Sequence, residues 1–259
     1  MGKTIAIANQ KGGVGKTTTA VNLGACLAAL HFRTLLVDFD PQGNASSGVG
    51  CERDAVEHSV YDVLAGRVSA RDAIVGTTVP MLDLIAAKTD LAAAEIELVG
   101  EDNREHILRD SLADVVDDYD FIVLDCPPSL SLITLNALCA ANTVLIPIQA
   151  EYYALEGLAR LLETIEMLKK SLNPGLRIEG MLITMHDARN NLSRQVEDEV
   201  RSHFPAHTYQ TVIQRNVRLS ESPSHGTPII TYDIDSRGAR NYMALAKEFV
   251  ERNRNEEGS

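Results

Sequence analysis

The stretch Lys11-Gly12-Gly13-Val14-Gly15-Lys16-Thr17-Thr18 decides the fold of this 259-residue chain. It separates an apolar, strand-like run at Thr4 to Ala8 from a segment with helical spacing of apolar residues, Thr17 to Leu30. A glycine-rich loop in this position can turn its backbone N–H groups toward a phosphate chain, and the helix N-terminus adds partial positive charge. The stretch therefore predicts a phosphate-binding loop; a tight connection without a ligand is the alternative.

P-loop chemistry assigns separate tasks to the residues of this loop. Lys16 is predicted to neutralise the β and γ phosphates of ATP, and the Thr17 hydroxyl to bind Mg²⁺. The backbone of Gly12, Gly13, Val14, Gly15 and Thr18 is predicted to cradle the phosphates. The spacing departs from G-x-x-x-x-G-K-[ST], because Gln10 stands where the first glycine is usual and an extra lysine, Lys11, follows it.

Apolar runs alternate with helical-period segments along the rest of the chain, which predicts βα units. The expected fold is α/β, with a mostly parallel, twisted sheet flanked by helices on both faces, in one domain over residues 1–259 with a disordered tail from about residue 253. The expected strands are Thr4 to Ala8, Thr34 to Asp38, Leu82 to Ala86, Phe121 to Asp125, Thr143 to Ile148, Ile178 to Thr184 and Tyr209 to Ile213. The expected helices are Thr17 to Leu30, Asn103 to Val116, Leu132 to Ala140, Leu155 to Leu172, Leu192 to His203 and Gly238 to Arg252, and residues 40–50 are expected to form a mobile loop.

Carboxylates follow two of the expected strands. Asp38 and Asp40 end the run Leu35-Leu36-Val37, and Asp125 ends Phe121-Ile122-Val123-Leu124. Ligands of open α/β folds bind at this edge of the sheet. An apolar strand ending in aspartate, downstream of a phosphate-binding loop, is a Walker B pattern in which Asp125 holds Mg²⁺ through water. For Asp40 a cap of the turn at Pro41 is the alternative.

Composition excludes several classes of function. The net charge of −12 argues against a surface that is basic throughout, so a nucleic-acid site has to be a local arginine cluster. No apolar run is long enough to span a membrane, and no signal peptide is expected, which predicts a cytoplasmic protein. The four cysteines lack C-x-x-C spacing, so buried thiols are expected and no zinc or iron–sulfur site.

The loop K-G-G-x-G-K-T-T resembles the deviant Walker A motif of the ParA and MinD family of ATPases, and the resemblance extends over essentially the whole chain. It implies that Lys11 crosses a dimer interface to the partner's nucleotide, so that hydrolysis depends on dimerisation. Asp38-Phe39-Asp40-Pro41-Gln42-Gly43-Asn44 looks like the family's switch I, which gives Asp40 the attacking water and Asp38 support of the Mg²⁺ waters. Cys126-Pro127-Pro128-Ser129 resembles switch II. The segment around Asn216 resembles the adenine contact, although Gln214 stands where proline is usual.

Two longer segments, Gln149 to Gly157 and Asn216 to Gly226, look like the chromosomal ParA branch, often called Soj. The resemblance implies that Arg189 and Arg218 contact DNA phosphates without reading sequence, with Arg215 and Arg194 assisting; a solvated surface arginine is the alternative for each. It also implies an ATP-dependent homodimer, nonspecific double-stranded DNA and a ParB-type centromere-binding protein as partners, and a nucleoid-associated location. The polar, acidic C-terminal end argues against membrane binding.

Three other functions stay open from the sequence. One is a metabolic kinase or ligase of the same superfamily, with a substrate pocket in place of a partner surface. Another is a positioning ATPase similar to MinD. A third is a nucleotide-gated regulator of replication initiation, which is compatible with DNA segregation.

Overall fold

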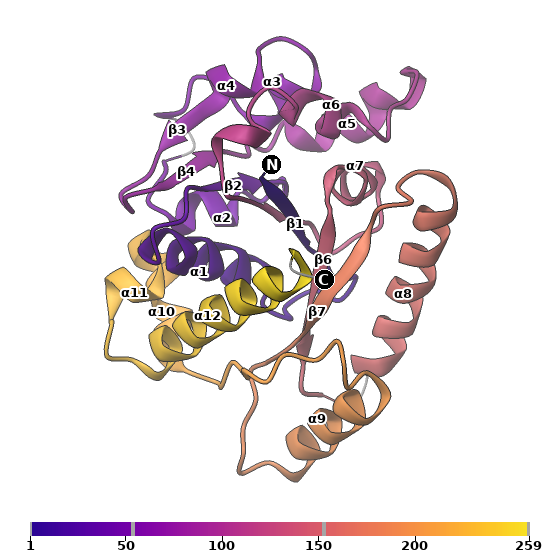
Figure 1. Ribbon diagram of the computed structural model, residues 1–259. Coiled ribbons are helices and arrows are strands. Elements are labelled where there is room, and N and C mark those ends of the chain that lie inside the picture. The colour runs from indigo at the N-terminus through magenta and orange to yellow at the C-terminus, as the bar shows by residue number, and fades with distance from the viewer. Residues whose placement is uncertain (1, 53–54, 152–153, 258–259) are drawn as a thin grey trace.

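The computed structural model describes residues 2–52, 55–151 and 154–257, and its centre is a seven-stranded sheet (Figure 1). The strand order is β3-β4-β2-β5-β1-β6-β7, and every pairing is parallel except that of β3 with β4. The strands are β1 (Lys3–Ile7), β2 (Thr34–Asp38), β3 (Ile74–Gly76), β4 (Leu82–Ile85), β5 (Phe121–Asp125), β6 (Thr143–Gln149) and β7 (Arg177–Thr184).

Helices cover both faces of this sheet (Figure 1). They are α1 (Lys16–Ala29), α2 (Asn44–Gly48), α3 (Val60–Leu64), α4 (Ala70–Ala73), α5 (Leu91–Glu97), α6 (Ile107–Leu112), α7 (Leu132–Ala140), α8 (Ala154–Ser171), α9 (Asn191–His203), α10 (Val217–Glu221), α11 (Ile229–Tyr232) and α12 (Arg237–Glu257). Short 3₁₀ turns lie at η2 (Leu98–Gly100), η3 (Val116–Asp118) and η4 (Ser222–His225). The predicted fold class is confirmed.

Alternation along the central strands divides the core between the two faces. Ile5 and Ile7 of β1 pack with α1 and α12, whereas Ala6 packs on the opposite face with α7 and α8. Every residue of β2 and β5 is buried. Parallel strands covered on both faces are apolar throughout, and this explains why the sequence marked them so clearly.

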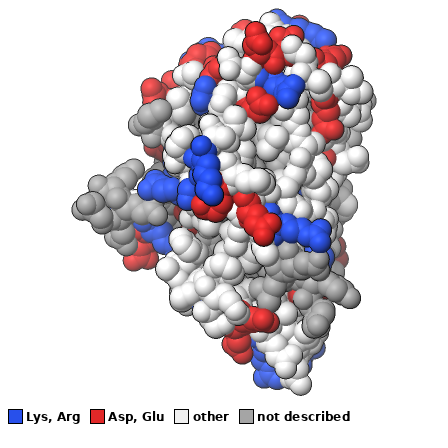
Figure 2. All heavy atoms as spheres, turned by 90° about the vertical axis from the view of Figure 1, so that its right-hand side faces the viewer, with Lys and Arg blue, Asp and Glu red and all other residues white. Residues whose placement is uncertain are grey.

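The surface on the side of α8 and α9 mixes charges of both signs. Figure 2 shows Lys and Arg beside Asp and Glu on this face, with uncharged surface between them. No helix within the described ranges is long and apolar enough to cross a membrane. The cysteines are free thiols, buried at Cys26, Cys126 and Cys139 and half-buried at Cys51.

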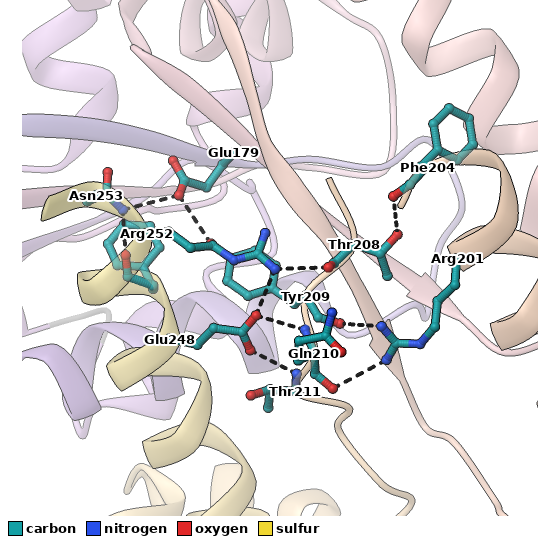
Figure 3. A network of polar contacts seen from close by, with 11 residues as sticks. Glu179, Arg201, Phe204, Thr208, Tyr209, Gln210, Thr211, Glu248, Arg252 and Asn253 are labelled. Atoms are coloured by element: carbon teal, nitrogen blue, oxygen red, sulfur yellow. Dashed lines mark hydrogen bonds and ion pairs between the residues drawn. The ribbon is translucent and has the colours of Figure 1, made fainter. Parts of the chain in front are cut away.

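The expected strand from Tyr209 to Ile213 is wrong. Two isolated bridges, at Thr208 and Gln214, and a few backbone hydrogen bonds, among them Ile213 N–H to the Ile183 carbonyl at 2.9 Å, connect this part of the chain to the β7 edge of the sheet without forming a continuous strand. The backbone N–H groups of Gln210 and Thr211 donate instead to the carboxylate of Glu248 on α12, both at 2.8 Å (Figure 3). The side chain of a distant helix thus takes two of the donors in the middle of this segment, and the ladder of a strand is interrupted there.

Three other local expectations also differ from the structure. The expected helix from Asn103 to Val116 is reduced to α6, because Asn103 has a positive φ of 54° and a 3₁₀ turn follows at η3. The expected mobile loop at residues 40–50 contains α2. Helix α12 continues to Glu257 where a loose tail was expected, and Asn253 bonds there to Glu179 at 3.2 Å. The short elements β3, α3, α4, α5, α10 and α11 were not expected.

Candidate active site

The glycine-rich loop joins β1 to α1 at the C-terminal edge of the sheet. Gly13 and Gly15 have φ angles of 73° and 88°, in the left-handed region that favours glycine. Gly15 is the N-cap residue of α1, and the helix begins at Lys16. The sequence thus allows the chain to bend back sharply and to point the N-terminus of a 14-residue helix at this loop.

Neighbouring strands hold the loop in place. The Asn9 amide donates to the Pro147 carbonyl in β6 at 2.8 Å and accepts from the Lys11 backbone N–H at 3.0 Å. The Thr184 hydroxyl, at the end of β7, donates to the Val14 carbonyl at 2.8 Å. The loop is therefore fixed before a ligand arrives, and no local pattern in the sequence indicated the contribution of Thr184.

The Lys16 ammonium folds back over the loop and donates to the Lys11 carbonyl oxygen at 3.1 Å. The Lys16 residue is buried, and burial lowers its pKa, while the charges of Asp125, Cys126 and Asp40 act in the opposite direction. A cation held among carboxylates, beside a glycine loop and a helix N-terminus, can neutralise the terminal phosphates of a nucleotide.

Asp38 and Asp125 are register partners at the ends of β2 and β5, and both are fully buried. Burial and the Asp38 charge raise the pKa of Asp125 well above its ordinary value, and the nearby Thr17 side chain and Lys16 charge offset part of that rise. Neither carboxylate oxygen of Asp125 has a hydrogen-bond partner within described residues. A buried carboxylate without a donor fits a cation that is bound through water.

Asp38 uses its carboxylate to anchor α2. It accepts from the Ser46 N–H and from the Ser46 hydroxyl, both at 2.7 Å, and from the Asp40 N–H at 3.3 Å. Burial raises its pKa to about 6, and the bonds from Ser46 and Asp40 oppose that rise. Asp38 therefore connects the segment after β2 rigidly to the site. Nothing in the local sequence distinguishes Ser46 from Ser47, so the role of Ser46 could not be predicted.

Asp40 lies in the same cluster and is also buried. Its carboxylate accepts from the Gln42 N–H at 2.9 Å, so it caps the turn at Pro41, as the alternative interpretation expected. Its charge also acts on both Lys16 and Asp125. Asp40 can therefore cap the turn at Pro41 and also lie in the cluster with Lys16 and Asp125.

The described residues contain no group of three or more His, Cys, Asp or Glu that could hold a metal ion by themselves. Mg²⁺ binding differs from such a cage, because the ion keeps several waters and is shared with substrate phosphates. Thr17 at the start of α1, with Asp125 and Asp38 behind it, could hold Mg²⁺ in this way. The donor set fits Mg²⁺ only together with a phosphate ligand.

Comparison with known proteins agrees with this geometry. A family model described as an AAA domain matches residues 2–178. The sporulation initiation inhibitor protein Soj of Bacillus subtilis (strain 168) is 59% identical over 248 residues, which cover 96% of this chain and 98% of that protein. The chromosome partitioning protein ParA of Myxococcus xanthus (strain DK1622) is 52% identical over 252 residues, covering 97% and 89%. The chain belongs to the ParA/Soj family of chromosome-partitioning ATPases.

Among solved structures, cobyrinic acid a,c-diamide synthase from Mycobacterium smegmatis with bound ADP and magnesium superposes with a TM-score of 0.84. It is 37% identical, and the match covers 95% of this chain and 93% of that one. The resemblance of the phosphate-binding loop to the ParA family is thus confirmed at the level of the family and the fold.

Two expected residues of the ParA/Soj pattern make contacts within the protomer. Asn216 is the N-cap of α10, and its side chain accepts from the Arg218 N–H at 2.8 Å. Lys11 forms an ion pair with Glu151 at 3.2 Å. Glu151 was not singled out from the sequence. Tyr152 and Tyr153 of the Soj-like segment lie outside the described residues.

The arginines expected at DNA are exposed, and two of them are paired with acids. Arg189 donates to Asp187 at 3.1 Å from two nitrogens, and this bond lowers the pKa of Asp187 to about 2, with a smaller effect from Arg215. Arg189 and Arg215 therefore lie near the same carboxylate. The remaining contacts are those of Arg218 with Glu221 at 2.9 Å and Asp233 at 3.3 Å, and of Arg194 with the Asn191 side chain.

Proposed function

We propose that this member of the ParA/Soj family is a Mg²⁺-dependent ATPase whose ATP-bound homodimer holds nonspecific double-stranded DNA in chromosome or plasmid segregation. One observation carries the proposal. The buried Lys16 ammonium lies in one electrostatic cluster with Asp40 and Asp125, beside a pre-formed glycine loop. The loop and the Lys16 ammonium suit the phosphates of a nucleoside triphosphate, and the carboxylates suit the Mg²⁺ ion that accompanies them.

The nucleotide is proposed to lie along the loop. The backbone of residues 12–18 wraps the phosphates, and Lys16 leaves the Lys11 carbonyl to bind the β and γ oxygens. Asn216 remains our candidate for the adenine contact through the side-chain atoms that its cap does not use. The diamide synthase of the same fold has bound ADP and magnesium, which supports a nucleotide as the ligand of this chain.

The Thr17 hydroxyl and the Asp125 carboxylate are proposed to hold the metal ion, with Asp38 orienting its waters. When bound, Mg²⁺ would neutralise charge that develops on the β and γ phosphates during cleavage. Asp40 orients the attacking water by accepting its hydrogen bond. The Gln42 N–H fixes the Asp40 carboxylate for this task at 2.9 Å, and positioning of the water is the main contribution a protein makes to this reaction.

Lys11 is proposed to act on the nucleotide of the partner protomer. Lys11 is paired with Glu151 of its own protomer, and its side chain is one-third exposed. It is therefore available to a second copy of the chain. Hydrolysis then depends on dimerisation, and product formation releases the dimer.

DNA binding is proposed to depend on Arg189, Arg215 and Arg218 of both protomers. The chain carries a net charge of −12, and the face in Figure 2 mixes both signs, so bulk charge does not favour DNA. A few phosphate contacts per protomer give marginal affinity, and a dimer doubles their number within one rigid unit. Dimerisation thereby controls DNA binding.

The proposed partner is a ParB-type centromere-binding protein that stimulates hydrolysis. The location that follows is the cytoplasm, in association with the nucleoid. Regulation of replication initiation through protein contacts is compatible with the same switch.

The test is size-exclusion chromatography of Asp40→Ala protein with ATP, with ADP and without nucleotide, each with and without a short DNA duplex. We expect a dimer with ATP, and a monomer with ADP or without nucleotide. DNA should co-elute with the ATP-bound dimer and not with the monomer. A monomer at saturating Mg²⁺ and ATP would contradict the proposal. The similarity to cobyrinic acid a,c-diamide synthase favours a second candidate, a small-molecule ligase. Wild-type ATP turnover that responds to a metabolite, and not to DNA with a ParB-type protein, would support that candidate.

A further inference from the structure

Three hollows lie in a row beside α12 and share lining residues. The largest, about 700 Å³, lies between the end of α1, residues 78–81, α11 and α12. The next, about 440 Å³, shares Lys247 with it. The third, about 400 Å³, shares Phe32, Val250 and Arg254 with the second. The first two meet at Lys247, and we call them together the α12 groove.

The α12 groove follows one face of the helix. Its α12 residues include Arg240, Met243, Lys247, Val250 and Arg254, spaced by three and four positions. From Arg240 to Arg254 the helix rises about 21 Å, at 1.5 Å per residue. The groove therefore has the length of a helical segment of about 14 residues.

The floor of the groove is apolar and open. It includes Ala28, Leu30 and Phe32 from the end of α1 and the residues that follow it, and Met243 from α12. In the larger of its two hollows, Ile234 is 72% exposed and Met81 is 40% exposed. Large apolar side chains gathered at one groove are typical of a surface that another molecule covers.

The rim of the groove is basic in a protein that is acidic overall. Arg240, Lys247 and Arg254 line it, and Glu251 is the one acidic lining residue of the two hollows. Within the described residues none of these three cations has an ion pair with an acid, although Arg240 donates to the Asp235 carbonyl oxygen. The third hollow is different, because Asp117, Asp118 and Asp120 line it. Carboxylates thus stand beside the cations Lys3, Arg33 and Arg254 in the third hollow, whereas cations outnumber acids in the first two.

We propose that the α12 groove docks a helical segment of a partner protein, with an apolar face and acidic residues along the borders of that face. An amphipathic helix in a groove is recognised by apolar anchors spaced by three and four residues, and exposed cations at the rim select for carboxylates beside them. DNA fits less well, because an apolar floor offers no contact to phosphates.

Docking in this groove leaves the nucleotide site open. Ala28 lies twelve residues after Lys16 on α1, which places the groove about 18 Å along the helix from the phosphate-binding loop. The inference therefore stands independently of the proposed function.

The test uses a fluorescent synthetic peptide of about 15 residues, with leucines at helical spacing and glutamates at the borders of the leucine face. A matched peptide carries lysines in place of the glutamates. Fluorescence anisotropy with the wild-type chain should show binding of the glutamate peptide at least roughly tenfold tighter than that of the lysine peptide. Ile234→Asp and Lys247→Glu should each weaken the glutamate peptide by roughly tenfold. Both positions are exposed, so circular dichroism should report unchanged folding.

Two substitutions elsewhere are matched controls. Ile96→Asp changes an isoleucine that is 80% exposed on α5, and Lys170→Glu changes an exposed lysine on α8; both should leave peptide binding unchanged. Equal affinity for both peptides, or equal losses in the controls, would overturn the proposal. Displacement of the peptide by a short DNA duplex would assign the groove to DNA instead. Nucleotide-independent self-association that Ile234→Asp abolishes would assign it to a second copy.

Discussion

The ammonium group of Lys11 lies 3.2 Å from the carboxylate of Glu151, within the same protomer. The Gln149 amide donates to that carboxylate at 2.6 Å, which fixes its position after β6. The Lys11 and Glu151 side chains are 34% and 50% exposed. Exposed ion pairs contribute little free energy, so Lys11 can leave Glu151 at a small cost when a partner's nucleotide comes near.

Glu151→Gln removes this competing charge and keeps the size of the side chain. Because Lys11 no longer has to leave a carboxylate, the ATP-bound dimer should become tighter by about two- to fivefold, the range that an exposed pair allows. Sedimentation equilibrium with ATP, in the Asp40→Ala background, measures the dimer constant. Glu166→Gln, which removes an exposed partner of Lys169, is the control. A weaker dimer would mean that Glu151 itself contributes to the interface.

Gly12→Val separates folding from dimerisation. A Cβ atom at Gly12 meets no other atom within 4 Å, so the protomer has room for a side chain there. We expect unchanged thermal unfolding and retained ATP binding, but loss of the ATP-dependent dimer, because the added methyl groups extend toward an approaching partner. Light scattering with ATP shows the loss. Dimerisation at the wild-type level would place the interface away from this loop.

The sequence predicted those parts of the site that depend on local order. Asp38 and Asp125 follow buried strands, and parallel strands bring their carboxyl ends to one edge, so their proximity follows from position alone. The glycines predicted the turn into α1, because glycine adopts the positive φ angles that a sharp turn needs. These features need no knowledge of distant contacts.

Distant contacts explain what the sequence did not predict. Tyr209 is fully buried, and its ring lies where a Cβ at residue 180 would be, 2.5 Å from one ring carbon, so only Gly180 fits beneath it. That packing, with Glu248 bonding the following N–H groups, replaces the expected strand (Figure 3). Ser46 is paired with Asp38 through a loop whose composition resembled a mobile segment. Neither the packing of Tyr209 on Gly180 nor the bond of Ser46 to Asp38 produces a periodic pattern in the sequence.

The stability of the protein without nucleotide and Mg²⁺ should rise as the pH falls from about 7.5 to about 5.5. Asp38 has a pKa of about 6 in the folded chain against an ordinary value of 3.8, so the folded state takes up a proton before the unfolded state does. The folded state is penalised above pH 6, and the penalty shrinks as the pH falls. Asp38 contributes about 1 kcal/mol to the gain over this interval.

Urea unfolding followed by circular dichroism, in the presence of a chelator, measures this gain at both pH values. Asp38→Asn should reduce the dependence of the unfolding free energy on pH. An identical pH dependence in the variant would show that Asp38 is charged at neutral pH without penalty.

Arg218→Ala tests the DNA surface by its dependence on salt. Arg218 is exposed and paired with Glu221 and Asp233, so its removal should leave the fold and ATP-dependent dimerisation unchanged. Removing the cation from one DNA phosphate makes the slope of log affinity against log salt shallower by about 0.9, so the slope for a dimer should change by about twice that amount. Filter binding of a random duplex over a salt series measures the slope. Arg109→Ala removes another exposed arginine paired with an acid, Asp110, and should leave the slope unchanged. Equal slopes for wild type and Arg218→Ala would remove Arg218 from the surface that holds DNA.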